Sequence, residues 1–98
     1  MGTFHPDHDE LHGYTVVITT STPTTYIGRW YNESEDGRIL LNDASIHNDG
    51  ENETSSEDFI KKSATWGVSV TQPQAIVERA VVKEIRKLGD VAKEVRGW

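Results

Sequence analysis

Three histidines near the start of the chain carry ring nitrogens that can bind a metal ion. His5, His8 and His12 are interleaved with Asp7 and Asp9, which add carboxylate oxygens. Zinc and nickel both accept such mixed ligands. No distant ligand is evident, however, and a flexible segment loses conformational entropy when it forms a site. Metal binding by the three histidines therefore competes with a simpler interpretation, a solvated N-terminal arm, and we expect no cofactor.

Aromatic and basic residues in the middle of the chain are a second group with recognisable chemistry. They are Tyr26, Trp30, Tyr31 and Trp66, with Arg29 and Arg38 nearby. Aromatic rings stack on bases and arginines bind phosphates, so such a surface suits single-stranded nucleic acid. Along a strand, Tyr26 and Trp30 share one face and Tyr31 lies on the other. We expect Trp66 and one of these sets in the hydrophobic core, which leaves the other set for binding.

The sequence offers no catalytic grouping. Glu33, Glu35 and Asp36 can pair as acid and base only if something raises a pKa, and no apolar residue surrounds them. A glycine-rich phosphate loop and a Ser-His-Asp grouping are both absent from the sequence. Cysteine is absent too, which excludes disulfides, thiolate zinc sites and a thiol nucleophile. We therefore expect a protein that is not an enzyme and has no small-molecule substrate.

Length and charge restrict the function further. The chain has 98 residues, enough for one small domain, with 16 acidic and 10 basic residues and a net charge of -6. This charge repels polyanions, so a broad electrostatic surface for DNA is not expected. No apolar run is long enough to span a membrane, and the N-terminus lacks a signal-peptide pattern. We expect a cytoplasmic protein without a membrane partner.

The first half of the chain predicts three consecutive strands. β-Branched residues favour a strand over 14–20, and later strands are expected over 25–31 and 38–46. The turns between them are predicted at 21–24, which contains proline, and at 33–37, which ends in Asp-Gly. Strands joined by turns this short form an antiparallel meander.

Three other segments have a clear composition. Residues 1–13 are polar, and Pro6 followed by acidic residues indicates a short helix inside this N-terminal arm. Residues 47–58 contain only small, polar and acidic residues, which predicts a disordered acidic surface loop. Residues 65–70 alternate and predict a fourth strand.

Residues 74–96 fit two structures. Apolar residues recur at a helical period, with Thr71 as a cap and Pro73 in the first turn. Val81 and Ile85 also fit one face of a final strand, which leaves only the residues from about 90 in a helical tail. Two folds follow. One is mostly β, with five antiparallel strands and a C-terminal helical tail; the other is α+β, a four-stranded meander with one long C-terminal helix.

The runs Thr25–Trp30 and Ile39–Ala44 resemble the first conserved motif of the Sm-like superfamily, which includes the LSm and Hfq proteins. The resemblance covers about residues 6–46 well and 64–87 loosely. It implies an SH3-like five-stranded barrel over 14–88, followed by a tail over 89–98. Gly28 fits this fold because a glycine lets a strand bend sharply enough to help close a barrel.

The resemblance weakens at the residues that bind RNA. Family members bind uridine-rich RNA through an aspartate and an asparagine, and Ser34 and Arg38 stand at the matching positions. The Arg-Gly of the second motif is matched only by Arg79 followed by Ala80. Family members also form rings by pairing edge strands. The resemblance thus implies a non-catalytic binding or assembly module whose partner is protein or another copy of itself.

RNA binding is the alternative implied function, through a rearranged site with little sequence preference. The candidate residues for nucleic-acid or partner binding are Arg29, Tyr31, Ser34, Arg38 and Arg79.

Overall fold

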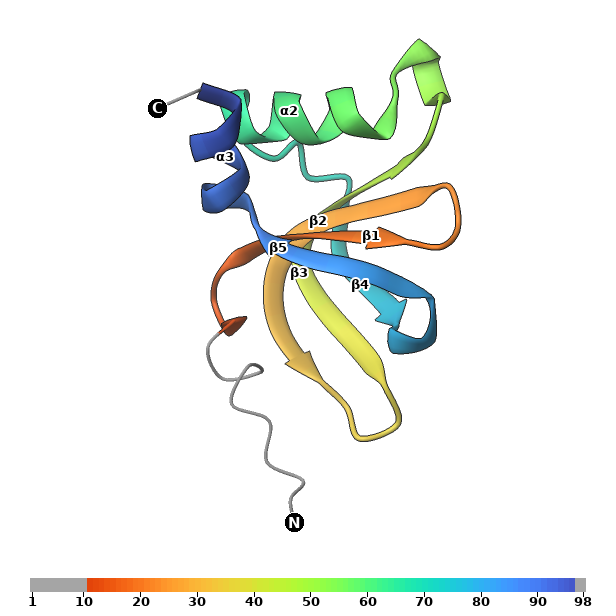
Figure 1. Cartoon of the computed structure of the whole chain (residues 1–98). Helices are drawn as coiled ribbons and strands as arrows, with labels where there is room; N and C mark the ends of the chain where they lie inside the picture. The colour runs from red at the N-terminus through yellow and green to blue at the C-terminus, as the bar shows by residue number, and fades with distance from the viewer. Residues whose placement is uncertain (1–10, 97–98) are drawn as a thin grey trace.

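The computed structural model describes residues 11–96 and has a mostly-β fold built on one five-stranded antiparallel sheet (Figure 1). The strands are β1 (Thr15–Thr20), β2 (Thr24–Glu33), β3 (Arg38–Asn48), β4 (Gln72–Glu78) and β5 (Val82–Lys87). The helical elements in these residues are η1 (Glu51–Glu53), α2 (Ser56–Trp66), η2 (Arg79–Val81) and α3 (Leu88–Arg96). The five-stranded prediction is confirmed, and the alternative with four strands and one long C-terminal helix is wrong.

The strands follow the order β4-β3-β2-β1-β5 across the sheet, so β4 and β5 form its two edges. The pairing of β2 with β3 shifts register between Ile27 and Arg29, and again between Trp30 and Asn32. Beside the first shift, Asp43 of β3 has a φ of 50°, a conformation that aspartate tolerates better than most residues. Such bulges bend and twist a strand, which lets this sheet curl into a small barrel.

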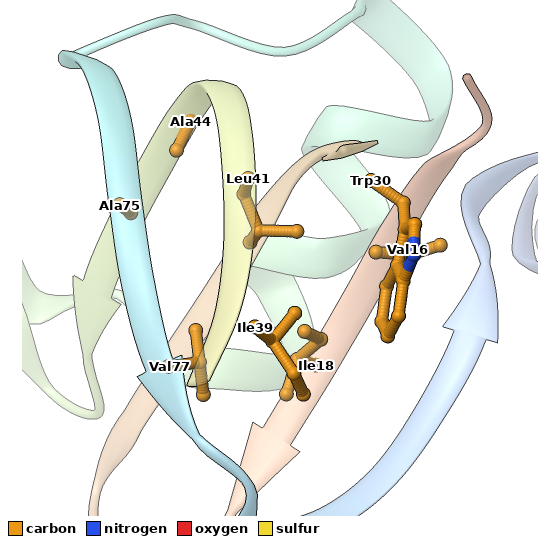
Figure 2. Close-up of a cluster of buried hydrophobic side chains, with 8 residues drawn as sticks. All are labelled: Val16, Ile18, Trp30, Ile39, Leu41, Ala44, Ala75 and Val77. Atoms are coloured by element: carbon orange, nitrogen blue, oxygen red, sulfur yellow. The ribbon is translucent and has the colours of Figure 1, made fainter. Parts of the chain in front are cut away.

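Buried side chains from β1, β2, β3 and β4 fill the interior of the barrel (Figure 2). They are Val16, Ile18, Trp30, Ile39, Leu41, Ala44, Ala75 and Val77. Gly28 lies against this interior. A Cβ added at Gly28 would lie 3.1 Å from the Cβ of Leu41 and 3.2 Å from the Cα of Ala44. These distances are shorter than about nine in ten Cβ contacts in real structures, so the close approach of β2 to β3 favours a glycine at residue 28.

The opposite face of the sheet is covered by α2 and α3, which lie side by side in Figure 1. Val17 and Ile27 point to this face and form a small cluster with Val91 of α3. Half-buried side chains surround the cluster: Phe59, Ile60, Ala64, Val68 and Leu88. No helix among residues 11–96 has the length and apolar character needed to cross a membrane. Helices α2 and α3 form a second, smaller hydrophobic core with the sheet.

The segment before β4 differs from its prediction. The prediction of a disordered loop over 47–58 is wrong, because β3 continues to Asn48 and helix α2 begins at Ser56. The Ser55 side chain accepts a hydrogen bond of 3.1 Å from the Asp58 amide. This N-cap satisfies one of the amides that a helix leaves unpaired at its start. The polar composition of residues 47–58 thus gave no indication that a helix begins within them.

Tertiary contacts hold α2 in place. The ring of His47, at the end of β3, stacks on Phe59 of the helix with 4.7 Å between the ring centroids. The helix ends at Trp66, and the C-cap residue Gly67 has a φ of 96°. The predicted strand over 65–70 is therefore wrong, and so is the prediction of Trp66 in the core, since its side chain is 85% exposed.

The C-terminal segment changes from strand to helix at Leu88. Val82 and Ile85 contact the barrel interior while β5 pairs with β1. Sheet pairing thus uses positions that also fit a helical period, and α3 begins two residues before the predicted position at 90. The short helix expected within 1–13 lies almost wholly outside the described residues. Leu11, near its end, contacts the interior core.

Candidate functional site

The turns that follow β2 and β4 lie together, and they bring together three of the five predicted binding residues. The Arg79 amide donates a hydrogen bond of 2.7 Å to the carbonyl of Gly37, which joins the two turns. Ser34 and Arg38 lie on either side of Gly37 in the first turn. We call residues 33–38, 78 and 79 the turn cluster.

Ser34 uses its side chain to close its own turn. Its Oγ accepts a hydrogen bond of 3.1 Å from the Arg38 amide and donates another to the Asp36 carboxylate. The bond from Ser34, together with the charge of Arg38, holds the pKa of Asp36 below its ordinary value although burial opposes this shift. Ser34, which the sequence resemblance aligns with an RNA-binding aspartate of Sm-like proteins, thus has a structural role in the turn.

Arg79 binds a carboxylate of the protein itself. Its Nε and Nη2 lie 2.9 Å and 2.6 Å from the two carboxylate oxygens of Glu33, a two-point ion pair. The Glu33 side chain is only 7% exposed. Hydrogen bonding to Glu33 raises the pKa of Arg79 above its ordinary value, and burial opposes this shift. Moving Arg79 to an RNA phosphate would leave a buried carboxylate without this partner, which is unfavourable.

The charge of the turn cluster is negative. Arg38 lies 3.8 Å from Asp36 and 3.6 Å from Glu78, so it too faces carboxylates. With Glu33 and Glu35, the cluster has four acidic residues against two arginines, a net charge of -2. RNA phosphates are repelled by this arrangement.

The other two predicted residues, Arg29 and Tyr31, have different partners. Arg29 Nη2 lies 2.7 Å from the Asp43 carboxylate, beside the bulge in β3. Tyr31 is 46% exposed, and its carbonyl lies 2.7 Å from Nδ1 of His12. The Tyr31 ring is partly exposed but already lies 5.8 Å from the His12 ring, centroid to centroid, and Arg29 on the same strand is paired with an acid.

The metal site predicted from the three histidines receives no structural support. His5 and His8 lie outside the described residues, and His12 uses one ring nitrogen in its contact with Tyr31. Across residues 11–96 there is no group of three or more histidine, aspartate or glutamate side chains arranged to hold a metal ion. Metal binding stays a prediction from the sequence.

The two sheet edges are candidate sites whose residues the sequence interpretation missed. Within the described part of the chain, β4 pairs only with β3 and β5 pairs only with β1. The outer backbone groups of an edge strand can pair with another strand. Ile76 of β4 is 58% exposed. The apolar run Ala75–Val77 was a usable signal for a strand, but Val77 also fits the helical period of the C-terminal segment.

Sequence comparison identifies no relative, because no family model and no curated protein matches this chain. Solved structures do share the fold. An Sm protein from Pyrococcus abyssii, in complex with a uridine heptamer, aligns with a TM-score of 0.54 and 14% identity over 81% of this chain and 89% of that chain. A heptameric archaeal Sm protein aligns with a TM-score of 0.52 and 11% identity over 85% of this chain and 97% of that one.

A third structure matches more of the chain. A chain from the NatC complex bound to CoA aligns with a TM-score of 0.56 and 16% identity. The alignment covers 97% of this chain and 99% of that chain, so it extends over both the sheet and the helices.

Proposed function

Because this chain has an Sm-like fold, we propose that it is a non-catalytic assembly module that joins copies of itself, β4 of one copy pairing with β5 of the next. The observation that carries this proposal is the pair of edge strands, each without a partner on its outer side among the described residues. Pairing through backbone groups needs few particular side chains, so it tolerates a diverged sequence. The heptameric archaeal Sm protein, which shares the fold, supports the proposal.

The test is the mass of the purified protein, measured by light scattering together with the ratio of absorbance at 260 and 280 nm. We expect a mass that is a multiple of 11.0 kDa and an absorbance ratio typical of pure protein. A protein that stays at 11.0 kDa at micromolar concentration contradicts self-assembly.

RNA binding is the second candidate, supported by the Pyrococcus abyssii Sm protein, which was solved with a uridine heptamer. The net charge of -2 in the turn cluster and the engagement of Arg38 and Arg79 argue against a tight site. We expect weak binding without preference for uridine. Titration of labelled oligo-uridine and oligo-adenine at about 0.1 M salt, where exposed charges are partly screened, tests this. Tight binding that favours uridine would replace assembly as the proposed function.

A different protein as partner is the third candidate, supported by the nearly complete match to a chain of the NatC complex. Such a partner would occupy the same two edges. A pure protein that is monomeric, contains no nucleic acid and binds no oligonucleotide favours this candidate over the other two.

A further inference from the structure

We propose that Ile76 of one copy packs into a hollow beside β5 of the next copy, so that α2 and α3 take part in the interface. The inference rests on the proposed self-assembly through β4 and β5. It adds the side chains that would make the contact between copies specific.

Ile76 lies on the outer face of an edge strand. Its neighbours Ala75 and Val77 are buried in the barrel interior, and side chains alternate along a strand, so Ile76 points the other way. Its 58% exposure leaves a β-branched apolar side chain in water. Exposed apolar residues on an edge strand are a typical attachment point for another strand.

A hollow of about 290 Å³ lies beside the other edge of the sheet. It is lined by Glu57, Ile60, Lys61, Arg86, Val91 and Glu94. Ile60 of α2 and Val91 of α3 provide its apolar surface. Arg86 of β5 forms an ion pair with Glu94 of α3, and both charged side chains line the hollow. The hollow is thus made jointly by β5 and the two helices.

The faces of the two edges correspond. Ile85 of β5 contacts the interior core, so Arg86 points to the outer face, where the helices lie. When one sheet continues into another, the interior faces join and the outer faces join, with adjacent strands about 4.8 Å apart. Pairing of β4 with β5 of the next copy therefore puts Ile76 on the same face as Arg86, and in the register that places the two residues opposite each other Ile76 lies at the opening of the hollow.

The charges of the two edges are complementary. Strand β4 carries one acidic residue, Glu78, and no basic residue. Strand β5 carries Lys83, Arg86 and Lys87 against Glu84, a net charge of +2. The opposite charges of β4 and β5 favour their pairing, whereas the like charges of two β5 strands disfavour pairing between them. A second copy in a head-to-tail arrangement therefore fits the edge, although the whole chain has a net charge of -6.

Cross-linking tests the contact directly, because the chain contains no cysteine of its own. The proposal places Ile76 of one copy beside Ile60 of the next, so the double variant Ile60→Cys with Ile76→Cys should form a ladder of disulfide-linked oligomers on oxidation. A disulfide forms only where the two Cα atoms come within about 7 Å, so the ladder reports this contact. The matched control is Ile60→Cys with Val70→Cys, because Val70 is a comparably exposed apolar residue that precedes β4, with 52% exposure. The control should remain monomeric on a denaturing gel. Equal ladders in both variants, or a ladder in neither, would overturn the inference.

A charge substitution separates this inference from the proposed function. Ile76→Asp should reduce the mass to 11.0 kDa while the single copy stays folded, since the side chain is exposed there. Val70→Asp should keep the wild-type mass. If the wild-type protein is already monomeric, self-assembly itself fails. If the wild type assembles and Ile76→Asp assembles equally well, only the role of Ile76 fails.

Discussion

The two faces of the sheet are buried in different ways. The interior face is enclosed by the curled sheet and has eight buried cluster residues, with half-buried side chains around them. The opposite face has only Val17, Ile27 and Val91 fully buried, and the side chains around them remain half-exposed. The barrel core thus contains no residue of α2 or α3. This difference indicates that stability is concentrated inside the barrel, which leaves α2 and α3 available to shape an interface.

Val16 and Val17 give the most direct test of this comparison, because they are neighbours in β1 and point to opposite faces. Their exposures are 0% and 2%, so the same truncation removes the same buried carbons. We expect Val16→Ala to lower the free energy of unfolding by about 2.5 kcal/mol, since the tightly packed barrel interior retains a cavity. Val17→Ala should lower it by only about 1.5 kcal/mol, the transfer free energy alone, because the helices can shift inward. Urea unfolding measures both. Equal losses would mean that the two cores are equally rigid.

Gly28 and Gly89 extend the test to added atoms. Gly28→Val places a side chain against Leu41 and Ala44, and we expect such overpacking to lower stability by about 2 kcal/mol. Gly89 lies in α3, where an added Cβ would meet no neighbouring atom within 4 Å, so Gly89→Ala should raise stability by about 0.5 kcal/mol through helix propensity. Thermal melts should show a lower melting temperature for Gly28→Val and a higher one for Gly89→Ala. A Gly28→Val variant that melts within about two degrees of wild type would mean that β2 has room at this point.

The parts of the fold that were predictable are those determined by neighbouring residues. β-Branched runs and the Asp-Gly turn located β1, β2 and β3, and the bend at Gly28 was identified from one residue type and its spacing. Helix α2 was missed because its position depends on the contact of Phe59 with His47 and on a cap at Ser55. Trp66 was misassigned because large aromatic residues are usually buried, whereas this one ends a helix in solvent.

The candidate site was predictable only in part, for a similar reason. The positions of Ser34, Arg38 and Arg79 were inferred from a motif, and the structure does bring them together. The partner of Arg79 was not inferred, because Glu33 reaches it across two turns that are far apart in the sequence. Long-range ion pairs leave no local pattern.

Ser55 tests how far the helix face depends on its cap. Ser55→Ala removes the acceptor for the Asp58 amide, and we expect a loss of about 1 kcal/mol, typical of an N-cap. Ser55→Asp should retain the wild-type stability, because aspartate also caps helices and its charge suits a helix start. Hydrogen exchange should locate the loss in the amides of α2, with those of β1 unchanged. Faster exchange in β1 would mean that the barrel does depend on the helices.

The smallest effect is expected at Arg29, which lies outside both cores. Its ion pair with Asp43 is 2.7 Å long, but both side chains are 52% exposed. Exposed ion pairs contribute little in water, so we expect Arg29→Ala to change the free energy of unfolding by less than about 0.5 kcal/mol. Asp43→Asn should be equally mild, because asparagine also tolerates the φ of 50° at this bulge. Denaturant unfolding at low and high salt measures both variants. If Arg29→Ala instead costs more than about 1 kcal/mol at low salt and less at high salt, the ion pair itself holds the bulge. The curvature of the barrel would then depend on surface charge as well as on the packing around Gly28.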